Sequence, residues 1–392
     1  MSSYILHLGL SGFPASNAPL ERIRLTFKAL KNGPFTPIII NKHSVNVKDN
    51  IKRVGFYDGI PLIFTSIITY RPTSYILRNM NKLSGYLGEF LFLYKKRKKI
   101  HSAIFYESAF FELIYYRILS KCFRFKLVIQ YVEFRSSIPN RQKGFIAYND
   151  WLFDNYCFSL CDGIIVISEF LRNRVISKKQ LLPIIKIPAI NDFDEFKLYT
   201  RPLVCDYLMY CGSIVYLPVI NFVINVYCKL KTLHLYNGSL LLVIGGKETD
   251  PNFIALKKKI DNIGFNNSIF LYTNISHDDL VQLYLGAELL IVPIRNTLQD
   301  IAGFHHKVGE YTAACKPIIS NNIGEMKYYF RDGISAILAD EYIVESYITK
   351  ISLSLVSKEA LSSIARNGHE VGFYYLNYKT YSEELKNFLL SI

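Results

Sequence analysis

Residues 4–40 read YILHLGLSGFPASNAPLERIRLTFKALKNGPFTPIII, which is a strand, a glycine loop, a helix and a second strand in succession. The apolar run Tyr4–Leu8 ends at the loop Gly9–Pro14, and apolar residues then recur at helical spacing from Ala18 to Leu30. Thr36–Ile40 is the second apolar run. This order is typical of a βαβ unit, so the stretch predicts an α/β fold with a parallel sheet.

The same alternation continues along the chain in two blocks. The second block opens with the apolar run Tyr207–Gly212 and a helix from Pro218 to about Leu230, and the polar segment Asn191–Pro202 separates it from the first. Further strand candidates are 61–64, 103–106, 126–130, 163–167, 239–246, 268–272, 288–292, 317–320 and 335–338. We therefore expect two similar α/β domains in tandem, followed by a helical, aromatic stretch at 371–392 that is long for a tail and should dock on something.

Charge is unevenly distributed over the 392 residues. Half of the residues are apolar and 20% are charged, which is typical of a globular chain, and the net charge is +14. Residues 1–190 carry 28 Lys and Arg against 11 Asp and Glu, or +17, and residues 191–392 carry 18 against 21, or −3. This asymmetry indicates an anionic partner of the first half, which is a nucleic acid, a phospholipid surface or a phosphorylated substrate.

The densest basic run, Lys95–Lys99, follows the apolar aromatic stretch Tyr86–Tyr94. One interpretation is an interfacial helix that docks on an anionic membrane, because cations attract acidic headgroups and the apolar part is too short to span. The other is a core helix with a solvated basic end. No recognised DNA- or RNA-binding motif accompanies the charge, so nucleic acid is not an expected partner.

The ends and the cysteines predict a cytoplasmic protein without a metal site. Met1–His7 lacks the basic start and apolar stretch of a signal peptide, and no uncharged apolar run reaches about 18 residues. The seven cysteines include no Cys-x-x-Cys pair, so we expect reduced and mostly buried thiols. Cys157 and Cys161 lie one helical turn apart but have no further ligand nearby.

The first strand ends at Gly9 and Gly12, in a loop that lies where parallel α/β sheets bind ligands. The loop lacks the Gly-x-Gly-x-x-Gly pattern, and Pro14 and Pro19 interrupt the place where a dinucleotide-binding helix would begin. A nicotinamide dehydrogenase is therefore disfavoured. The glycines either let the backbone approach a phosphate or a sugar or only permit a tight turn.

A denser group of chemical residues lies at Gly303–Tyr311, GFHHKVGEY, where a loop enters a helix. A helix N-terminus favours anions, so His305, His306 and Lys307 could hold a diphosphate. Glu310 lies one turn further on, where a carboxylate can accept both hydroxyls of a ribose. The alternative is a helix whose first turn happens to be charged. Zinc binding by His305 and His306 is not expected, because adjacent side chains rarely point to one metal ion.

Residues 303–319 resemble the Glu-x7-Glu region of retaining glycosyltransferases of the GT-B fold, glycosyltransferase family 4. The second glutamate of that motif matches Glu310, and Lys316–Ile319 matches the strand after it. Four other segments are similar to motifs of the family, in the family's order: Cys161–Ser168, Tyr210–Ser213, Leu242–Gly246 and Ala287–Pro293.

The resemblance implies two Rossmann-like domains. Residues 1–195 would bind the acceptor, residues 196–372 would bind a nucleotide-diphosphate sugar, and a helix at about 373–392 would cross back to the first domain. The implied activity transfers the sugar with retention to a glycan or a lipid-linked saccharide of cell-surface polysaccharide synthesis, without a metal or another cofactor. The expected donor contacts are Gly212, Ser213, Gly245, Gly246, Gly303, Phe304, His305, His306, Lys307 and Glu310, and the expected acceptor-side residues are Gly9, Gly12, Glu133 and Arg135.

Three departures from the family pattern determine which residues are candidates for catalysis. Ala302 stands at the first glutamate, with Asp300 as the nearest carboxylate, and Ser213 and Pro218 stand where the family has its phosphate-binding Arg and Lys. The diphosphate would then depend on Lys307 with the two histidines. Glu133 and Arg135 stand where relatives often have a histidine, and an ordinary surface ion pair is the alternative for them. The catalytic candidates are Glu310, Lys307, Asp300 and Glu133.

Two other functions remain compatible with the sequence. A non-catalytic GT-B binding subunit is suggested by Ala302 and by the missing Arg and Lys. Another GT-B enzyme, such as a sugar-nucleotide epimerase, would share the donor motifs.

Overall fold

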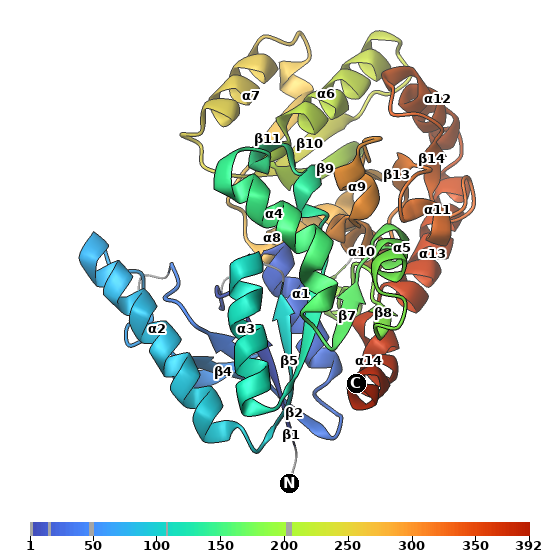
Figure 1. Ribbon diagram of the computed structural model, residues 1–392. Helices are drawn as coiled ribbons and strands as arrows, with labels where there is room; N and C mark the ends of the chain where they lie inside the picture. Colours follow the sequence, from blue (N-terminus) through green and yellow to red (C-terminus); the bar gives the residue numbers. More distant parts are fainter. Residues whose placement is uncertain (1–2, 15–16, 47–50, 107–108, 201–205) are drawn as a thin grey trace. The chain divides into compact units, whose positions relative to one another are not determined.

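The computed structural model describes residues 3–14, 17–46, 51–106, 109–200 and 206–392. The chain divides into two compact units (Figure 1). Unit 1 comprises Met1–Ile190, Ala302–Phe304 and Tyr378–Ile392, and unit 2 comprises Asn191–Ile301 and His305–Asn377. The sequence placed the corresponding boundaries at 195 and 373. Pro202, the end of the expected polar boundary segment, and Cys205 lie outside the described residues.

Unit 1 contains an eight-stranded sheet in the order β3-β4-β2-β1-β5-β6-β7-β8. Its strands are β1 (Ser3–Leu8), β2 (Phe35–Asn41), β3 (Val54–Tyr57), β4 (Ile60–Phe64), β5 (Ile100–Tyr106), β6 (Lys126–Tyr131), β7 (Gly163–Val166) and β8 (Ile184–Lys186). All described neighbours are parallel except the edge pair β3 and β4. The predicted βαβ unit is present, with Ile5 paired to Pro37.

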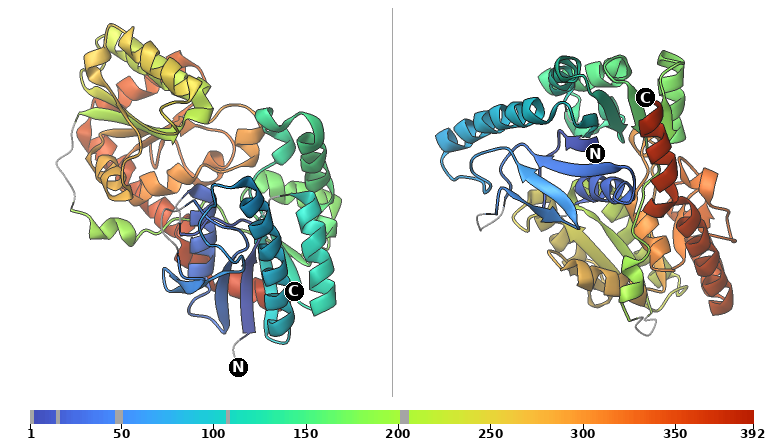
Figure 2. Two further views of the ribbon diagram at one scale, coloured as in Figure 1. Left: turned by 90° about the vertical axis from the view of Figure 1, so that its left-hand side faces the viewer. Right: turned by 90° about the horizontal axis from the view of Figure 1, so that it is seen from below.

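The helices of unit 1 lie on both faces of this sheet. They are α1 (Ala18–Ala29), α2 (Tyr75–Lys96), α3 (Phe110–Phe123), α4 (Gly144–Tyr156), α5 (Glu169–Lys178) and α14 (Ser382–Ser391). In Figures 1 and 2, α2, α3 and α4 cover one face and α1 covers the other. The first helix begins where the sequence predicts it, because Asn17 accepts a hydrogen bond from the Leu20 amide and Pro19 occupies the first turn.

Unit 2 contains a six-stranded parallel sheet in the order β11-β10-β9-β12-β13-β14. Its strands are β9 (Tyr207–Ser213), β10 (Ser239–Gly245), β11 (Ile269–Tyr272), β12 (Leu289–Ile291), β13 (Ile318–Asn321) and β14 (Ile337–Ala339). Its helices are α6 (Leu217–Thr232), α7 (Pro251–Asp261), α8 (His277–Gly286), α9 (Leu298–Ala302), α10 (His306–Ala313), α11 (Met326–Tyr329), α12 (Val344–Leu355) and α13 (Lys358–Tyr375).

The strands of unit 2 are apolar on both faces because helices cover both sides of a parallel sheet. Leu208, Leu240, Leu242 and Leu289 are fully buried in its core. Among the described residues one segment, Ile214–Thr232, is long and apolar enough to cross a membrane, although the sequence was expected to contain none. Half of it is buried, and the α6 part packs into this core, so packing within unit 2 accounts for its apolar character.

The C-terminal stretch is divided rather than one continuous helix. The segment up to Tyr375 completes α13 in unit 2, whereas the 3-10 turn Tyr378–Tyr381 and α14 belong to unit 1. A side-chain carbon on Gly163 of β7 would lie 2.8 Å from Phe388, so α14 packs closely on this sheet. The expected return of the C-terminal helix to the first domain is therefore present.

All six described cysteines are free thiols. Cys157 and Cys161 are buried as expected, but Cys211, Cys228 and Cys315 are half-buried and Cys122 is exposed. The expectation of mostly buried thiols is therefore correct for two of the six.

Candidate nucleotide-sugar site

The carboxyl edge of the unit 2 sheet has the topology of a ligand site. The chain order runs outward from β9 through β10 to β11 on one side, and from β12 to β14 on the other. The reversal lies between β9 and β12, and parallel sheets bind ligands outside the carboxyl ends at such a point. Ser213 ends β9, and Gly245, paired with it in register, ends β10. Two expected donor residues are thus neighbours at this edge.

The glycines at this edge differ in how much room a side chain would have. Gly246 has a φ of +159°, and a side-chain carbon there would lie 2.6 Å from Ile214 Cγ2. A side-chain carbon on Gly212 would lie 2.5 Å from the Tyr210 hydroxyl. Gly245 meets nothing closer than the Gly212 carbonyl at 3.7 Å. Packing therefore explains Gly212 and Gly246, whereas Gly245 lines an open stretch of backbone that a ligand can approach.

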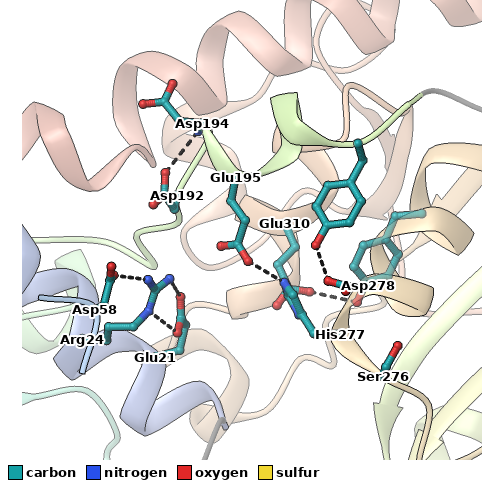
Figure 3. Close-up of polar contacts among 12 residues, drawn as sticks. Glu21, Arg24, Asp58, Asp192, Asp194, Glu195, Ser276, His277, Asp278 and Glu310 are labelled. Carbon is teal, nitrogen blue, oxygen red and sulfur yellow. Dashed lines mark hydrogen bonds and ion pairs between the residues drawn. The ribbon is translucent and has the colours of Figure 1, made fainter. Parts of the chain in front are cut away.

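Glu310, labelled in Figure 3, lies on α10 within a polar cluster. Its Oε2 accepts hydrogen bonds from Tyr284 Oη at 2.8 Å and from Lys307 Nζ at 2.7 Å. Lys307 Nζ also donates to Tyr284 Oη at 2.9 Å. Tyr311, the next residue of α10, accepts a hydrogen bond from the Cys211 amide at 3.1 Å, which fixes the helix against the end of β9.

The charges of this cluster hold Glu310 ionised. Burial by itself would raise the pKa of the Glu310 carboxyl, but Lys307 and then His306 outweigh it and lower that pKa to about 2. His306 Nε2 lies 3.5 Å from the other carboxylate oxygen, Oε1. The pKa of Lys307 is raised above its ordinary value, because the attraction of Glu310 outweighs the lowering effect of burial. The cluster therefore presents a charged acceptor to hydroxyl donors.

A second ion pair lies after β12 and was not recognised in the sequence as a functional feature. Arg295 donates from Nε and Nη2 to the two oxygens of Asp300, at 2.9 and 2.8 Å, and its amide donates to the same carboxylate. Asn321 at the end of β13 accepts from the Ile294 amide and fixes the loop that carries Arg295. The signal was available, because an arginine follows the expected strand 288–292 by three residues, at the switch point.

Asp300 is therefore a partner of Arg295 rather than an isolated carboxylate. Burial by itself would raise the pKa of the buried Asp300 carboxyl, but Arg295 and then the charge of His305 outweigh it and lower that pKa. Burial in turn lowers the pKa of His305, against the attraction of Asp300. The structure thus associates His305 with Asp300, and His306 and Lys307 with Glu310.

Gly303 and Phe304 belong by their contacts to unit 1. Ser168 Oγ donates to the Ala302 carbonyl, and both Ala302 and Phe304 are buried. The start of the Gly303–Tyr311 segment is consequently packed with the end of β7 and the start of α5, and only its later part lies in unit 2 with Glu310.

Two of the acceptor-side candidates are glycines with a structural explanation. Gly9 has a φ of +100°, and a side-chain carbon there would lie 2.9 Å from the Phe105 ring. Gly12 donates from its amide to Asn41 Oδ1 at 3.1 Å, and a side-chain carbon there would lie 2.7 Å from Leu20. The positive φ of Gly9 and close packing at both positions account for the two glycines without a ligand.

The other two acceptor-side candidates, Glu133 and Arg135, are not paired with each other. Arg135 Nε donates to Asp150 at 3.0 Å, and Arg141 donates to the same carboxylate at 2.6 Å. Asp150 is completely buried, and the two arginines lower its pKa against the effect of burial. Glu133 is exposed and makes no hydrogen bond or ion pair with the described part of the chain. The surface ion pair considered for them is therefore absent.

No metal cluster is present among the described residues, since no three His, Cys, Asp or Glu side chains there lie close enough to hold an ion.

Comparisons with known proteins give the class of this site. Residues 206–371 match the family model described as Glycosyl transferases group 1, a segment that runs from β9 into α13. A search of curated protein sequences gives no match.

Solved structures resemble the chain over its whole length at low identity. Sucrose-phosphate synthase from Thermosynechococcus elongatus has a TM-score of 0.78 at 14% identity, with 99% of this chain and 98% of that chain covered. A glycosyltransferase from Rickettsia africae has a TM-score of 0.70 at 16% identity, with coverage of 100% and 98%. Anabaena HepE in complex with UDP-glucose has a TM-score of 0.68 at 13% identity, with both chains covered completely.

The fold is thus that of GT-B glycosyltransferases, as the sequence predicted. The match of residues 206–371 to Glycosyl transferases group 1 indicates an enzyme of the glycosyltransferase class, the kind of activity that the sequence predicted. The matched segment contains the Glu310 cluster and the Arg295–Asp300 pair.

Proposed function

We propose that the protein is a retaining glycosyltransferase of family 4, which transfers a sugar from a nucleotide-diphosphate sugar to a glycan or a lipid-linked saccharide in cell-surface polysaccharide synthesis. The observation that carries this proposal is the ionised Glu310, held by Lys307 and Tyr284 within the segment that matches the group 1 family. Structural neighbours described as complexes with UDP and with UDP-glucose support the donor class.

Glu310 binds the ribose of the donor in this proposal. Its Oε2 already accepts two hydrogen bonds, from Tyr284 and Lys307, and its Oε1 lies beside His306. A carboxylate retains lone pairs for further donors, so a ribose diol can be held by charge-assisted hydrogen bonds. Tyr284 then acts as a positioning residue, because its hydrogen bond fixes the direction of the carboxylate, and Lys307 adds to this beside its own role at the diphosphate.

Two cations support the leaving diphosphate. The positions occupied by Arg and Lys in the family are Ser213 and Pro218 here, and Ser213 only caps the turn that starts at Ile214. Arg295 after β12 and Lys307 on α10 are the cations that we assign to this task, with His305 and His306 beside them. Asp300 holds Arg295 through two hydrogen bonds and is a positioning residue in this scheme.

Retention needs no carboxylate nucleophile in this scheme. The donor phosphate departs while cations stabilise its growing charge, and the acceptor hydroxyl attacks the same face of the sugar. Positioning of the two reactants contributes the rest of the rate enhancement. The proposal includes no metal ion and no other cofactor.

The acceptor binds to the basic unit 1 in this proposal, with Glu133 at the carboxyl edge of its sheet and the Gly9–Gly12 loop nearby. We place the protein in the cytoplasm, as a peripheral protein of the inner membrane face, because residues 1–190 carry a net charge of +17 and a lipid-linked acceptor is anionic and membrane-bound.

The test is a thermal-shift screen of UDP-, GDP- and ADP-sugars, followed by a turnover assay with candidate acceptors. A ligand that binds only the native state raises the unfolding temperature. We expect one nucleotide class to raise it in the wild type and in a Glu370→Gln control, and to lose most of this effect in Glu310→Gln. Binding without transfer or hydrolysis would instead favour a non-catalytic subunit, and conversion of the sugar without transfer would favour an epimerase.

A further inference from the structure

Helix α2 exposes its apolar side. Ile76, Met80, Leu83, Leu87, Phe90 and Tyr94 recur at intervals of three and four residues and are all exposed. Side chains at these intervals form one stripe along a helix. Leu83 is 63% exposed and Leu87 is 58% exposed. An amphipathic helix normally buries such a stripe in the core, so this stripe requires another explanation.

The side of α2 that faces the protein is polar or small. Asn81, Gly85 and Glu89 are buried. A side-chain carbon on Gly85 would lie 2.0 Å from the Lys42 carbonyl, and one on Gly88 would lie 2.1 Å from the Thr65 carbonyl. The helix backbone therefore lies directly on the segments that follow β2 and β4, and it cannot turn without clashes.

Hydrogen bonds fix this orientation at two points. Asn81 bonds to both the amide and the carbonyl of Ile68 at 2.8 Å. Glu89 accepts from Tyr116 Oη at 3.1 Å, and Tyr116 in turn accepts from Lys42 Nζ at 2.8 Å. The outward direction of the apolar stripe is therefore a built feature of unit 1.

The apolar surface continues over α3 and α4. Phe90 of α2 lies 5.4 Å from Phe123 of α3, and Phe111 of α3 stacks on Phe145 of α4 at 5.4 Å, measured between ring centroids. Phe145, Ile146, Tyr148 and Trp151 are exposed on α4. We call the exposed apolar side chains of α2, α3 and α4 together the outer face. Contiguous apolar surface of this extent marks an interaction site.

The charges on these helices are sorted by sign. The only carboxylate of α2 is Glu89, and those of α4 are Asp150 and Asp154; all three are completely buried. Glu112 of α3 is paired with Lys42. The cations are exposed instead: Lys82 in the middle of α2, and Lys121, Lys143 and four lysines of Lys95–Lys99 at or next to helix ends. The outer face is thus apolar and cationic.

We infer that the outer face docks on a lipid bilayer that contains anionic headgroups. Apolar and aromatic side chains enter the interface while flanking lysines meet acidic headgroups. Tyr and Trp are suited to this depth because each has an apolar ring and a polar atom. A second copy of the chain does not fit this face, because two such faces would bring like charges together without an exposed carboxylate on these helices to pair them.

The inference deepens the proposed function. The docking itself is argued from the outer face, and only its purpose, access to a membrane-bound acceptor, rests on the proposed function. The strands β4, β5 and β6 precede α2, α3 and α4, so each helix starts at the carboxyl edge of the sheet. The exposed Phe145, Ile146 and Tyr148 lie in the first turns of α4. Lipid contact there brings a membrane-bound acceptor next to the edge where parallel sheets bind ligands.

The test is flotation of the full chain with phosphatidylcholine vesicles, with and without phosphatidylglycerol, at low and high salt. We expect binding to the anionic vesicles that falls with salt. The emission of Trp151, the only tryptophan of the chain, should shift to the blue on binding, because its ring leaves water.

Two sets of variants separate the apolar and the charge contributions. Ile76→Gln, Leu83→Gln and Leu87→Gln together should weaken vesicle binding about 100-fold or more. Replacement of Lys95, Lys96, Lys98, Lys99 and Arg97 by Gln should weaken binding to anionic vesicles about 3,000-fold, at about fivefold per cation. Each variant has a matched control in unit 2. The control for the apolar variant combines Ile254→Gln, Leu353→Gln and Val356→Gln. The control for the charge variant replaces Lys229, Lys231, Lys247, Lys257 and Lys258 by Gln, and both control variants should bind vesicles as the wild type does.

Three results would overturn the docking. They are no vesicle binding by the wild type, equal binding by the outer-face and control variants, and binding to single-stranded nucleic acid in place of vesicles. A dimer in solution that only the Ile76, Leu83 and Leu87 variant disrupts would assign the face to a second copy. Nucleotide-sugar thermal shifts are measured without vesicles, so they test the proposed function independently of the docking. If only the docking is wrong, the outer-face variants retain these shifts. If only the proposed function is wrong, the shifts are absent in every variant while vesicle binding remains.

Discussion

Each unit contains a cluster of a lysine, a tyrosine and one or two carboxylates, and the two clusters differ in exposure. In unit 1, Lys42 bonds to Glu112 and Tyr116, and Tyr116 bonds to Glu89. Lys42 is 1% exposed and Glu89 is fully buried. In unit 2, Lys307 bonds to Glu310 and Tyr284, and the two charged side chains are 27% and 12% exposed.

The two carboxylates respond to these surroundings in opposite directions. Burial raises the pKa of Glu89 to about 7, against the attraction of Lys42, whereas Lys307 and His306 overcome the effect of burial and lower that of Glu310 to about 2. The closed cluster holds a helix in place, and the partly open one keeps a charge ready for a ligand. The same residue types thus serve structure or function according to how much water and ligand can reach them.

The closed cluster should be the more sensitive of the two to loss of its cation. Lys42→Met leaves the buried Glu89 and the half-buried Glu112 without their cation, so we expect unfolding to become easier by about 3–5 kcal/mol. Urea denaturation measures this change. The control Lys257→Met removes an exposed lysine paired with Glu248 and should cost less than about 1 kcal/mol. Equal losses in the two variants would mean that the Lys42 cluster does not support the fold.

Glu89 should make stability depend on pH. Between its ordinary value of 4.5 and about 7, the folded state retains a proton that the unfolded state has lost. The free energy of unfolding therefore decreases as the pH rises through this window, by about 2–4 kcal/mol. Denaturation at pH 5, 6, 7 and 8 tests this slope. Glu89→Gln should flatten it, and an unchanged slope in that variant would assign the dependence to another group.

The open cluster should respond most strongly in ligand binding. Glu310→Gln removes a charged acceptor of the ribose hydroxyls, so donor affinity should fall by about 1.5–3 kcal/mol, or roughly 10- to 150-fold. Isothermal titration with the nucleotide sugar found in the screen measures it. Donor affinity equal to that of the wild type in a folded variant would exclude Glu310 from the site.

The periodicity of the sequence was sufficient to predict the fold. Apolar runs and helical spacing located the central strands of both sheets, since those strands are buried on both faces. The edge strand β3 was missed because it is short and mostly exposed. The hairpin signal Asp58-Gly59 between β3 and β4 was present, and both residues have positive φ values of 52° and 69°.

The candidate site could be predicted only in part. Residues 303–311 contain Lys307 and Glu310 within one helical turn, so local spacing is sufficient to find them. The Lys42 cluster joins residues 27 to 74 positions apart, which no local pattern can show. The apolar stretch Tyr86–Tyr94 was recognised, but its direction depends on the contacts of Gly85 and Gly88 with distant carbonyls. Hydropathy measures how apolar a helix is and not which side it buries.

Lys307 should influence the rate more than the binding of the donor. Charge on the leaving diphosphate grows in the transition state, so Lys307→Ala should lower kcat about tenfold or more while donor affinity changes less. Steady-state kinetics separates the two parameters. Arg295→Lys provides a companion variant, because it retains a cation but loses the paired hydrogen bonds to Asp300. Equal losses in kcat and affinity would reduce Lys307 to a simple binding role.

Glu133 should show the smallest effect, and it extends the comparison to two neighbouring carboxylates of unit 1. It is exposed, whereas Asp150 is completely buried between Arg135 and Arg141. Glu133→Gln should therefore change the free energy of unfolding by less than about 0.5 kcal/mol, while Asp150→Asn should cost several times more. If Glu133 contacts the acceptor, its variant should raise the acceptor KM about two- to fivefold without changing donor affinity, because solvent weakens an exposed polar contact. Destabilisation by Glu133→Gln equal to that of Asp150→Asn would show that exposure does not separate the two roles.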